Sequence, residues 1–364
     1  MADASPQPAA PFRYVHSPRF PELLEQLQCS LLVTTYQAGR LMVVRSAGGR
    51  LSTLLRAFER PMGLAVDAAQ QRLALGTRRM LWMLRSEPDI APQLEPAGRH
   101  DACFVPRRAL VTGDMQGHEV AFCGDEVWIV NTRFSCLATL DDERYTFVPR
   151  WRPPFVDELV AEDRCHLNGF AIENGRVRYA TAMGETNTAG GWRDGKVGGG
   201  VVVDVQCDEV LARGFAMPHS PRIHRGELFV LDSGRGALVR VDRSTGERQV
   251  VAELPGYVRG LAFHGDFAFL GLSLVREKDV FAGMPITERF GADQRSCGVS
   301  VVNLNSGKVV AFLRFEAAIA EIFDVQVLAG MRWPGVLGIE GDGLDSVLTA
   351  PPDAWRRGAG LPGV

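Results

Sequence analysis

The sequence predicts an all-β fold, a six-bladed β-propeller built as one domain. Groups of three or four short, apolar strand segments recur at intervals of roughly 40 to 60 residues, with turn residues between them. Six of these segments open in a similar way, with a polar residue followed by small and apolar ones. Helical periodicity is weak along the chain, which argues against a Rossmann fold or a TIM barrel.

The expected strands follow the chain in order. The first unit comprises 30–36, 41–45 and 51–58, and the second 63–66, 72–76 and 80–84. The third comprises 119–122, 126–131 and 135–140, and the fourth 169–172, 177–183 and 200–205. The fifth comprises 221–223, 227–232, 237–242 and 248–252, and the sixth 260–263, 267–272, 299–304 and 309–315. Their alternating, β-rich composition and the Gly-, Asp- and Asn-containing turns between them are typical of antiparallel sheets.

Six segments are expected to form the inner strands around the axis: 60–66, 117–122, 163–172, 219–223, 257–263 and 321–327. The first unit lacks an inner strand, and the segment 322–328 lacks a sheet of its own. Placing 322–328 in the first unit closes the ring and removes the exposed sheet edges. The segment 336–339 has no place in this scheme, so seven blades remain an alternative.

The chain ends are expected to lie outside the propeller. Residues 1–15 are rich in Ala and Pro and are predicted to form a disordered arm. The propeller domain is expected over 16–345, and a tail over 346–364. We find neither a basic segment followed by an apolar one nor an apolar run of about 18 residues, so an export signal or a membrane span is not expected.

Charge and cysteine content narrow the class of protein. The 364 residues carry a formal net charge of −3, which gives no basic excess for binding nucleic acid or an anionic membrane. The seven cysteines are odd in number and contain no Cys-x-x-Cys pair. We therefore expect reduced thiols and a cytoplasmic location. The sequence leaves the oligomeric state open.

Three histidines stand at the heads of successive inner strands: His118, His166 and His219. The inner strands of a propeller converge on one channel, so these imidazoles are expected to meet at its mouth. Imidazole suits Zn²⁺ or another transition metal, and three protein ligands with an open position are the catalytic pattern. The alternative is that the three side chains merely line the channel.

Three further residues are candidates for catalysis. Arg259 heads the next inner strand, where it would stabilise an oxyanion or clamp a carboxylate, or form a salt bridge between blades. Tyr257 has the same strand parity as Arg259 and would act as a general acid. Glu119 would orient a ligand or act as a base, unless it faces away from the channel.

Four residues are candidates for substrate binding. Asn168 lies two positions after His166 on the same face of its strand, and Arg222 lies near the expected rim. Trp192 and Arg193 lie in the Gly-rich loop 184–199, which is expected to act as a lid or to be an exposed insertion.

Five short motifs resemble an uncharacterised bacterial family of propeller-like proteins of unknown function: Tyr36-Gln-Ala-Gly39, Gly117-His-Glu119, His166-Leu-Asn-Gly169, Gly190-Gly-Trp-Arg193 and Pro218-His-Ser-Pro-Arg222. The resemblance covers residues 30–328 and implies no activity. More distantly, the layout is similar to six-bladed propellers with NHL-type repeats. Among these, the peptide-amidating lyase binds a metal through three histidines from different blades, but this likeness is architectural and transfers no substrate.

Three hypotheses for function follow. The first is a metal-dependent lyase or hydrolase that acts on a small polar or carboxylated substrate in the channel, with Zn²⁺ on the three histidines. The second is a non-catalytic propeller that binds a peptide or a partner protein. The third is a lactonase-like propeller that binds Ca²⁺ through Asn168, Asp232 and Asp324. The histidines favour the first hypothesis over the third.

Overall fold

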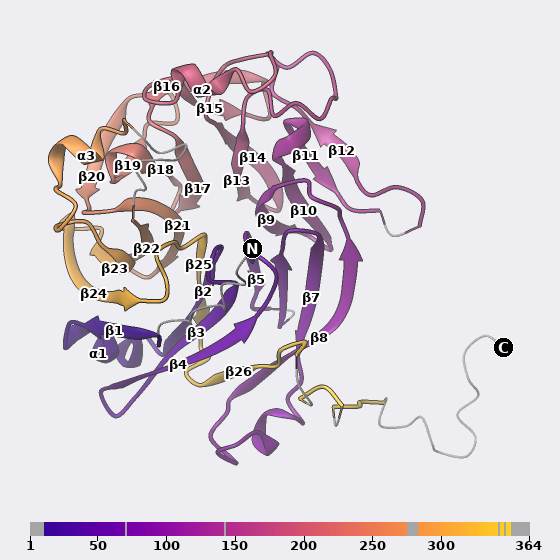
Figure 1. The fold of residues 1–364 in the computed structure, drawn as a ribbon, viewed down its shortest axis with the longest axis vertical. Coiled ribbons are helices and arrows are strands. Elements are labelled where there is room, and N and C mark those ends of the chain that lie inside the picture. The colour runs from indigo at the N-terminus through magenta and orange to yellow at the C-terminus, as the bar shows by residue number, and fades with distance from the viewer. Residues whose placement is uncertain are drawn as a thin grey trace, which may run out of the picture.

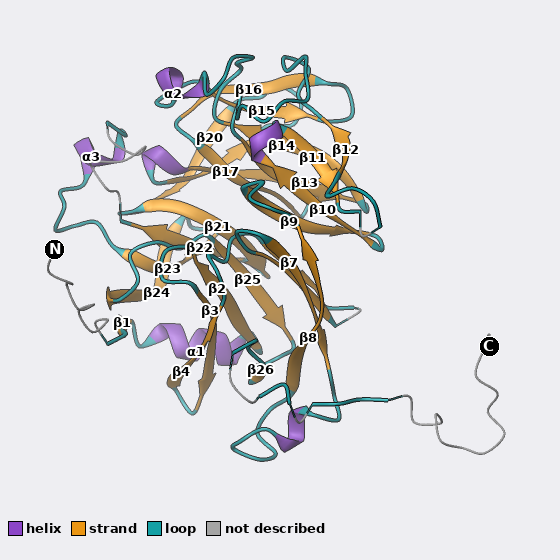
Figure 2. Ribbon diagram, turned by 45° about the vertical axis from the view of Figure 1, so that its right-hand side comes forward, coloured by secondary structure: helices purple, strands orange, loops and turns teal. Residues whose placement is uncertain are grey.

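The computed structural model describes residues 11–69, 71–141, 143–274, 283–340, 343–345 and 347–350. Its strands form six sheets arranged in a ring, as Figure 1 shows. Helices are short and lie at the edges of the sheets (Figure 2). The protein is therefore a six-bladed β-propeller, as the sequence predicted.

Counted from the axis outwards, each blade contains four antiparallel strands. Blade 1 contains β25 (Asp324–Ala329), β2 (Cys29–Thr35), β3 (Arg40–Ala47) and β4 (Arg50–Ala57). Blade 2 contains β5 (Leu64–Asp67), β6 (Arg72–Gly76), β7 (Met80–Ser86) and β8 (Ala102–Val111). Blade 3 contains β9 (Gly117–Cys123), β10 (Glu126–Asn131), β11 (Cys136–Thr139) and β12 (Val148–Trp151).

The remaining three blades follow the same order. Blade 4 contains β13 (Leu167–Glu173), β14 (Arg176–Ala182), β15 (Gly200–Asp204) and β16 (Glu209–Phe215). Blade 5 contains β17 (Pro218–His224), β18 (Glu227–Asp232), β19 (Ala237–Val241) and β20 (Arg248–Glu253). Blade 6 contains β21 (Tyr257–His264), β22 (Phe267–Ser273), β23 (Cys297–Asn303) and β24 (Lys308–Ala317).

The ring closes through a strand from the C-terminal part of the chain. β25 pairs antiparallel with β2, from Cys29 opposite Ala329 to Thr34 opposite Asp324. This confirms the predicted closure, although the strand begins two residues later than the expected 322–328. Blade 1 therefore depends on two parts of the sequence about 300 residues apart, which leaves no unpaired inner edge.

Two additional strands extend the outer edges of blades. β26 (Pro334–Val336) pairs parallel with β8, and β1 (Arg13–His16) pairs antiparallel with β24. Only Val336 of the segment 336–339 belongs to this strand, which extends blade 2, and the described residues contain no seventh blade. The expectation of a disordered arm over 1–15 is wrong for residues 13–15, because Phe12 packs against Phe315 and the strand is paired. Residues 1–10, 346 and 351–364 lie outside the described residues.

The helices are few and short. α1 (Arg19–Gln26) buries Phe20, Leu23 and Leu24 against blades 1 and 6, and so covers the joint where the ring closes. The others are α2 (Trp192–Gly195), α3 (Ile286–Arg289), η1 (Ala91–Gln93), η2 (Thr132–Phe134) and η3 (Ser233–Arg235). Among the described residues, no helix has both the length and the apolar character needed to cross a bilayer.

Glycines allow the inner strands to approach one another closely. A Cβ on Gly63 would lie 2.8 Å from the carbonyl oxygen of His118, and one on Gly169 would lie 2.6 Å from the Pro221 side chain. Gly260 has φ +80°, and a Cβ there would lie 2.6 Å from the Val325 nitrogen. Each glycine therefore lets two blades meet at the axis, which explains why small residues follow the polar heads.

The seven cysteines are all free thiols, as the sequence predicted. Five of them are buried: Cys29, Cys103, Cys136, Cys165 and Cys297. Burial raises the pKa of Cys29 and Cys136 to about 12, so these thiols remain protonated and unreactive at neutral pH. They therefore serve as small apolar core residues.

Candidate functional site

A cavity of about 420 Å³ lies at the N-terminal ends of the six inner strands. Every blade contributes one side chain from the head of its inner strand: Phe323, Met62, His118, His166, His219 and Arg259, from blades 1 to 6. The three histidines predicted from the sequence thus line one cavity, and Arg259 completes the wall beside them. The volume is within the range of small-molecule sites.

His118 and His166 lie next to each other in the cavity wall. Their ring centroids are 4.9 Å apart and the ring planes are nearly perpendicular, at 83°. His219 lies on the next blade, where its ring contacts that of Tyr257 at 5.8 Å. Among the described residues, no three side chains of His, Cys, Asp or Glu are close enough together to hold a metal ion.

His118 and His219 are held by the same pair of contacts. The Nδ1 atom of His118 lies 2.8 Å from the Gln116 carbonyl oxygen and 2.9 Å from Oγ1 of Thr132. The Nδ1 atom of His219 lies 2.9 Å from the Met217 carbonyl oxygen and 2.9 Å from Oγ of Ser233.

These contacts define the tautomer of both rings. A carbonyl oxygen only accepts hydrogen bonds, so Nδ1 carries the hydrogen in both histidines and Nε2 keeps its lone pair. The carbonyls reach the rings because the residues that carry them adopt the left-handed conformation, with φ 55° at Gln116 and φ 54° at Met217. The hydroxyls come from the first residues of η2 and η3, which occupy matching positions in blades 3 and 5.

His166 is held by a carboxylate instead. Its Nδ1 atom lies 3.0 Å from both Oδ atoms of Asp163. The same carboxylate accepts a hydrogen bond from Nε1 of Trp192 at 3.0 Å and lies 3.7 Å from Nη2 of Arg193. The Trp192 ring also packs on His166, with centroids 4.4 Å apart. A carboxylate on Nδ1 fixes the orientation of the ring.

The cavity keeps two of its histidines neutral. Burial lowers the pKa of His118 and His219 well below the ordinary value of 6.5, and the positive charge of Arg259 lowers both further. At neutral pH these rings therefore present Nε2 lone pairs rather than positive charge. A neutral imidazole is the form that binds metal ions and accepts protons.

Arg259 is a buried cation in the same wall. Its relative exposure is 7%, and its Cζ atom lies 3.3 Å from the centroid of the Phe323 ring. Burial lowers the pKa of the guanidinium, although Glu321 and other groups oppose this shift. The Nη2 atom has no hydrogen-bond partner within the part of the chain that the structure describes.

Trp192 and Arg193, from the Gly-rich loop 184–199, do not both lie where the residues of a lid would lie. Trp192 is 2% exposed, and its hydrogen bond to Asp163 fixes it as part of the cavity wall. Arg193 also lines the cavity, but its side chain is 57% exposed. The prediction of a lid is therefore wrong for Trp192, because its apolar ring is packed with Met183, Met217 and Tyr257.

Tyr257 and Asn168 lie behind the cavity wall. Tyr257 is 2% exposed, and burial raises the pKa of its phenol, so it does not line the cavity as expected for a general acid. Asn168 donates from Nδ2 to the Pro218 carbonyl at 2.7 Å and accepts a hydrogen bond from Thr181. Asn168 therefore joins blades 4 and 5 and does not line the cavity either.

Glu119 and Arg222 lie toward the opposite end of the channel, in the wall of a smaller hollow of about 220 Å³. Arg222 Nη2 lies 2.6 Å from Glu119 Oε1 and 3.9 Å from Asp324 Oδ1. Burial raises the pKa of Glu119 to about 7, and the nearby Asp324 opposes its ionisation as well. The proposed roles of Glu119 as a catalytic base and Arg222 as a substrate ligand therefore do not match their positions.

The calcium hypothesis relied on Asn168, Asp232 and Asp324. Asp232 accepts from the Ala216 amide at 2.8 Å and pairs with Arg235, also at 2.8 Å. Asp324 accepts from the Leu64 amide at 2.9 Å. None of the three lines the cavity, so each has a structural role in holding a turn or joining blades.

We expect Arg222→Ala to destabilise the protein strongly. The change leaves the carboxyl groups of Glu119 and Asp324 buried without their cation, and breaking a buried ion pair costs about 3–5 kcal/mol. The matched control is Arg225→Ala, whose 2.5 Å partner Asp266 lies at the surface, where a pair contributes less than about 1 kcal/mol. The free energy of unfolding in urea measures both, and equal losses would contradict the buried role.

Several residues of the site were not predicted from the sequence. Asp163 is the most important of them, and its spacing of three residues before His166 was a usable signal. Thr132 and Ser233 follow the second strands of their blades, so only the fold brings them to the histidines. Met62 and Phe323 occupy the head position in blades 2 and 1, and each follows a polar residue of the cavity wall, Arg60 or Glu321, by two positions.

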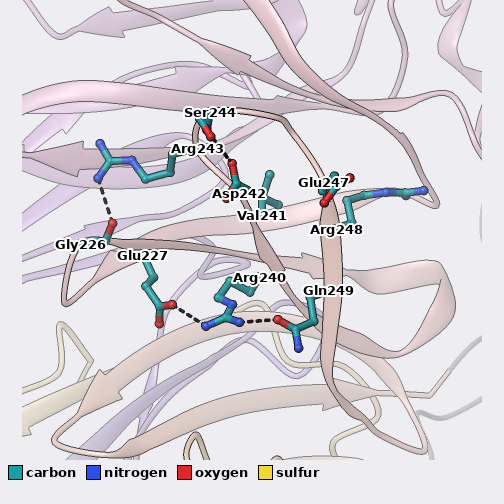
Figure 3. A pocket seen from close by; sticks show the side chains of 10 residues that line it. All are labelled: Gly226, Glu227, Arg240, Val241, Asp242, Arg243, Ser244, Glu247, Arg248 and Gln249. Carbon is teal, nitrogen blue, oxygen red and sulfur yellow. Dashed lines mark hydrogen bonds and ion pairs between the residues drawn. The ribbon is translucent and has the colours of Figure 1, made fainter.

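A larger hollow of about 690 Å³ lies among the strands and turns of blade 5 (Figure 3). Its polar side chains bind one another: Arg240 pairs with Glu227 at 2.5 Å, and the Ser244 hydroxyl donates to Asp242 at 2.6 Å. Arg243 donates to the Gly226 carbonyl at 2.9 Å. These contacts stabilise the turns of the blade, and we assign no function to this hollow.

The fold and the site define a six-bladed propeller with a histidine- and arginine-lined cavity on its axis. The chain belongs to the family described as "Domain of unknown function (DUF4915)", whose model matches residues 18–337. This agrees with the resemblance seen in the sequence. No curated protein matches the chain.

A solved structure titled "Crystal structure of Nidogen/Laminin Complex" aligns with the chain at a TM-score of 0.53. The alignment covers 83% of this chain and 99% of that chain, at 10% sequence identity. At this identity the similarity supports the propeller fold alone.

Proposed function

We propose that the protein is a metal-dependent enzyme, a lyase or hydrolase that acts on a small polar or carboxylated substrate in the axial cavity. The ion is a divalent transition metal, with Zn²⁺ as the first candidate, and its ligands are Nε2 of His118, His166 and His219. One observation carries the proposal: each imidazole has an acceptor at Nδ1, and all three residues line the same cavity.

This arrangement of acceptors is typical of histidines that bind metals. Metal-bound histidines almost always donate Nδ1–H or Nε2–H to a carbonyl or carboxylate, which fixes the tautomer that the ion needs. Here two carbonyls and the Asp163 carboxylate fill that role. The three donors lie farther apart than in a formed metal site, so the proposal requires them to draw together when an ion binds.

The chain's own residues would then have separate tasks. A bound ion would polarise a carbonyl or lower the pKa of water to about 7. Arg259 would bind a negative group of the substrate or charge that develops on it. Asp163 would hold His166 and Trp192 in position and keep water out of that side of the cavity. The free thiols support a cytoplasmic location for this chemistry.

The test is the metal content of the full-length protein. We expect about one equivalent of zinc after purification, or after chelation and reloading, and none after chelation alone. Elemental analysis measures this, and a competing chelator gives the affinity. A chelated protein that fails to take up Zn²⁺, Cu²⁺, Ni²⁺ or Co²⁺ would contradict the proposal.

The second candidate is a non-catalytic propeller that binds a peptide or partner protein. The separation of the three donors is the observation that favours it, because it leaves the histidines as polar wall residues. In that case ligand binding would be the same with and without metal, and no turnover would accompany it.

A further inference from the structure

The strongest unexplained feature of the cavity is the burial of Arg259 without a hydrogen-bond partner for Nη2. Its relative exposure is 7%. A buried N–H group of a cation that lacks an acceptor is destabilising, because its desolvation cost is not offset by a hydrogen bond. A ligand that accepts hydrogen bonds from this guanidinium would remove that cost.

The geometry of Arg259 suits a planar acceptor. One face of the guanidinium packs on the Phe323 ring, with Cζ 3.3 Å from the ring centroid. This contact holds the group in one plane, and its N–H bonds are directed within that plane. A guanidinium held in this way binds a carboxylate through two parallel hydrogen bonds.

The charges in the wall limit the anion to one negative charge. Four arginines and three acidic residues line the cavity, which leaves one positive charge in excess. Arg78 pairs with Asp114 at 3.0 Å, and Arg193 lies 3.7 Å from Asp163. Arg60 and Arg259 remain, with Glu321 as the third acidic residue, so the wall keeps one net positive charge. A carboxylate matches this charge, whereas a phosphate dianion would bring one negative charge too many.

The rest of the wall is apolar and suits the body of such a ligand. Met183, Met217, Trp192 and Phe323 all line the cavity, and the first three are at most 2% exposed. Thioethers and aromatic rings pack well against apolar or aromatic groups. The volume of about 420 Å³ is large enough for a carboxylic acid with one aromatic ring.

From these observations we infer that the cavity binds a monocarboxylic acid with an apolar or aromatic body, the carboxylate lying on Arg259 and the body against Met183, Met217 and Trp192. This inference rests on the proposed function, since it names the substrate class of the same site. It gives Arg259 the task of choosing the substrate, separate from the task of the histidines.

The test is isothermal titration calorimetry on the full-length chain with phenylacetate, its uncharged analogue phenylacetamide and the dianion phenylphosphonate. We expect phenylacetate to bind best and phenylacetamide to bind roughly 10- to 100-fold more weakly, as for the loss of a charged hydrogen bond. Arg259→Met should weaken phenylacetate binding by a similar factor. The control Arg225→Met, at the surface pair with Asp266, should leave binding unchanged.

Two further measurements keep this inference separate from the metal proposal. Titration of chelated protein measures the carboxylate site without an ion, so failure of zinc uptake leaves a positive result intact. The melting temperature of ligand-free Arg259→Met should equal or exceed that of the wild type, because a desolvated cation whose Nη2 lacks a hydrogen-bond acceptor is removed.

Three results would overturn the inference. The first is no binding of phenylacetate at millimolar concentration, and the second is equal binding of phenylacetate and phenylacetamide. The third is tighter binding of phenylphosphonate than of phenylacetate, which would assign the cavity to a dianion.

Discussion

A chain that ends at Phe323 will fail to fold. It lacks β25, the innermost strand of blade 1, and with it the ladder of pairs between β25 and β2. Val325 and Leu328 are at most 1% exposed, and burial of each contributes about 1.5–3 kcal/mol. Asp324 also joins blades, since it accepts from the Leu64 amide and its own amide donates to Thr34. These losses together rival the whole stability of an ordinary domain, about 5–15 kcal/mol.

Circular dichroism during heating tests this expectation. The chain ending at Phe323 should show no cooperative transition, or should be insoluble because the edge of β2 is exposed. The control is a chain that ends at Ala350, which keeps every described residue of the closing strand and of β26. A shortened chain that melts cooperatively near the wild-type temperature would contradict closure through β25.

The fold was predictable because the inner strands share a local requirement. The blades meet so closely at the axis that there is no room for a Cβ at Gly63, Gly169 and Gly260. Small residues therefore recur at similar positions of the inner strands, and this pattern is visible in the sequence. The partners of β1 and β26 were not predictable in the same way. Both strands are short and pair with residues more than 200 positions away, so no local signal identifies the neighbour.

The histidine-lined cavity was predictable for the same reason as the fold, since the heads of inner strands must meet at one end of the axis. The errors came from assuming regular alternation along those strands. The pairing register shifts between Val258 and Leu261 and between His219 and Arg222. Such irregularities turn side chains to a different side of a strand. They explain why Tyr257 lies behind the wall although Arg259 lines it.

Zinc binding should depend strongly on each of the three histidines. Replacing His118, His166 or His219 by Ala removes one of three proposed ligands, and we expect each variant to lose tight binding. Asp163→Asn removes only the carboxylate that holds His166, so it should weaken binding by roughly 10- to 100-fold, the usual effect of a group behind a ligand. The control is His224→Ala, whose ring stacks on Phe263 away from the cavity.

The pH dependence of zinc binding distinguishes these buried ligands from surface histidines. Protonation of an imidazole competes with the ion, so a surface site loses affinity as pH falls through about 6.5. The pKa of His118 and His219 lies well below 6.5 because of burial and Arg259. Their lone pairs therefore remain available below pH 6.5, and their protonation should weaken zinc binding only nearer the lowered pKa.

The same shift predicts the stability of the metal-free protein. Between pH 6.5 and the lowered pKa, His118 and His219 bind protons in the unfolded chain but not in the folded one. The free energy of unfolding should therefore decrease as pH falls through this window. In His118→Ala and His219→Ala this decrease should be smaller, and in His224→Ala it should be unchanged. Zinc titrations against a competing chelator and urea unfolding, each from pH 5 to 8, measure both effects. Equal zinc affinity in wild type and all three ligand variants would mean that the histidines do not hold the ion.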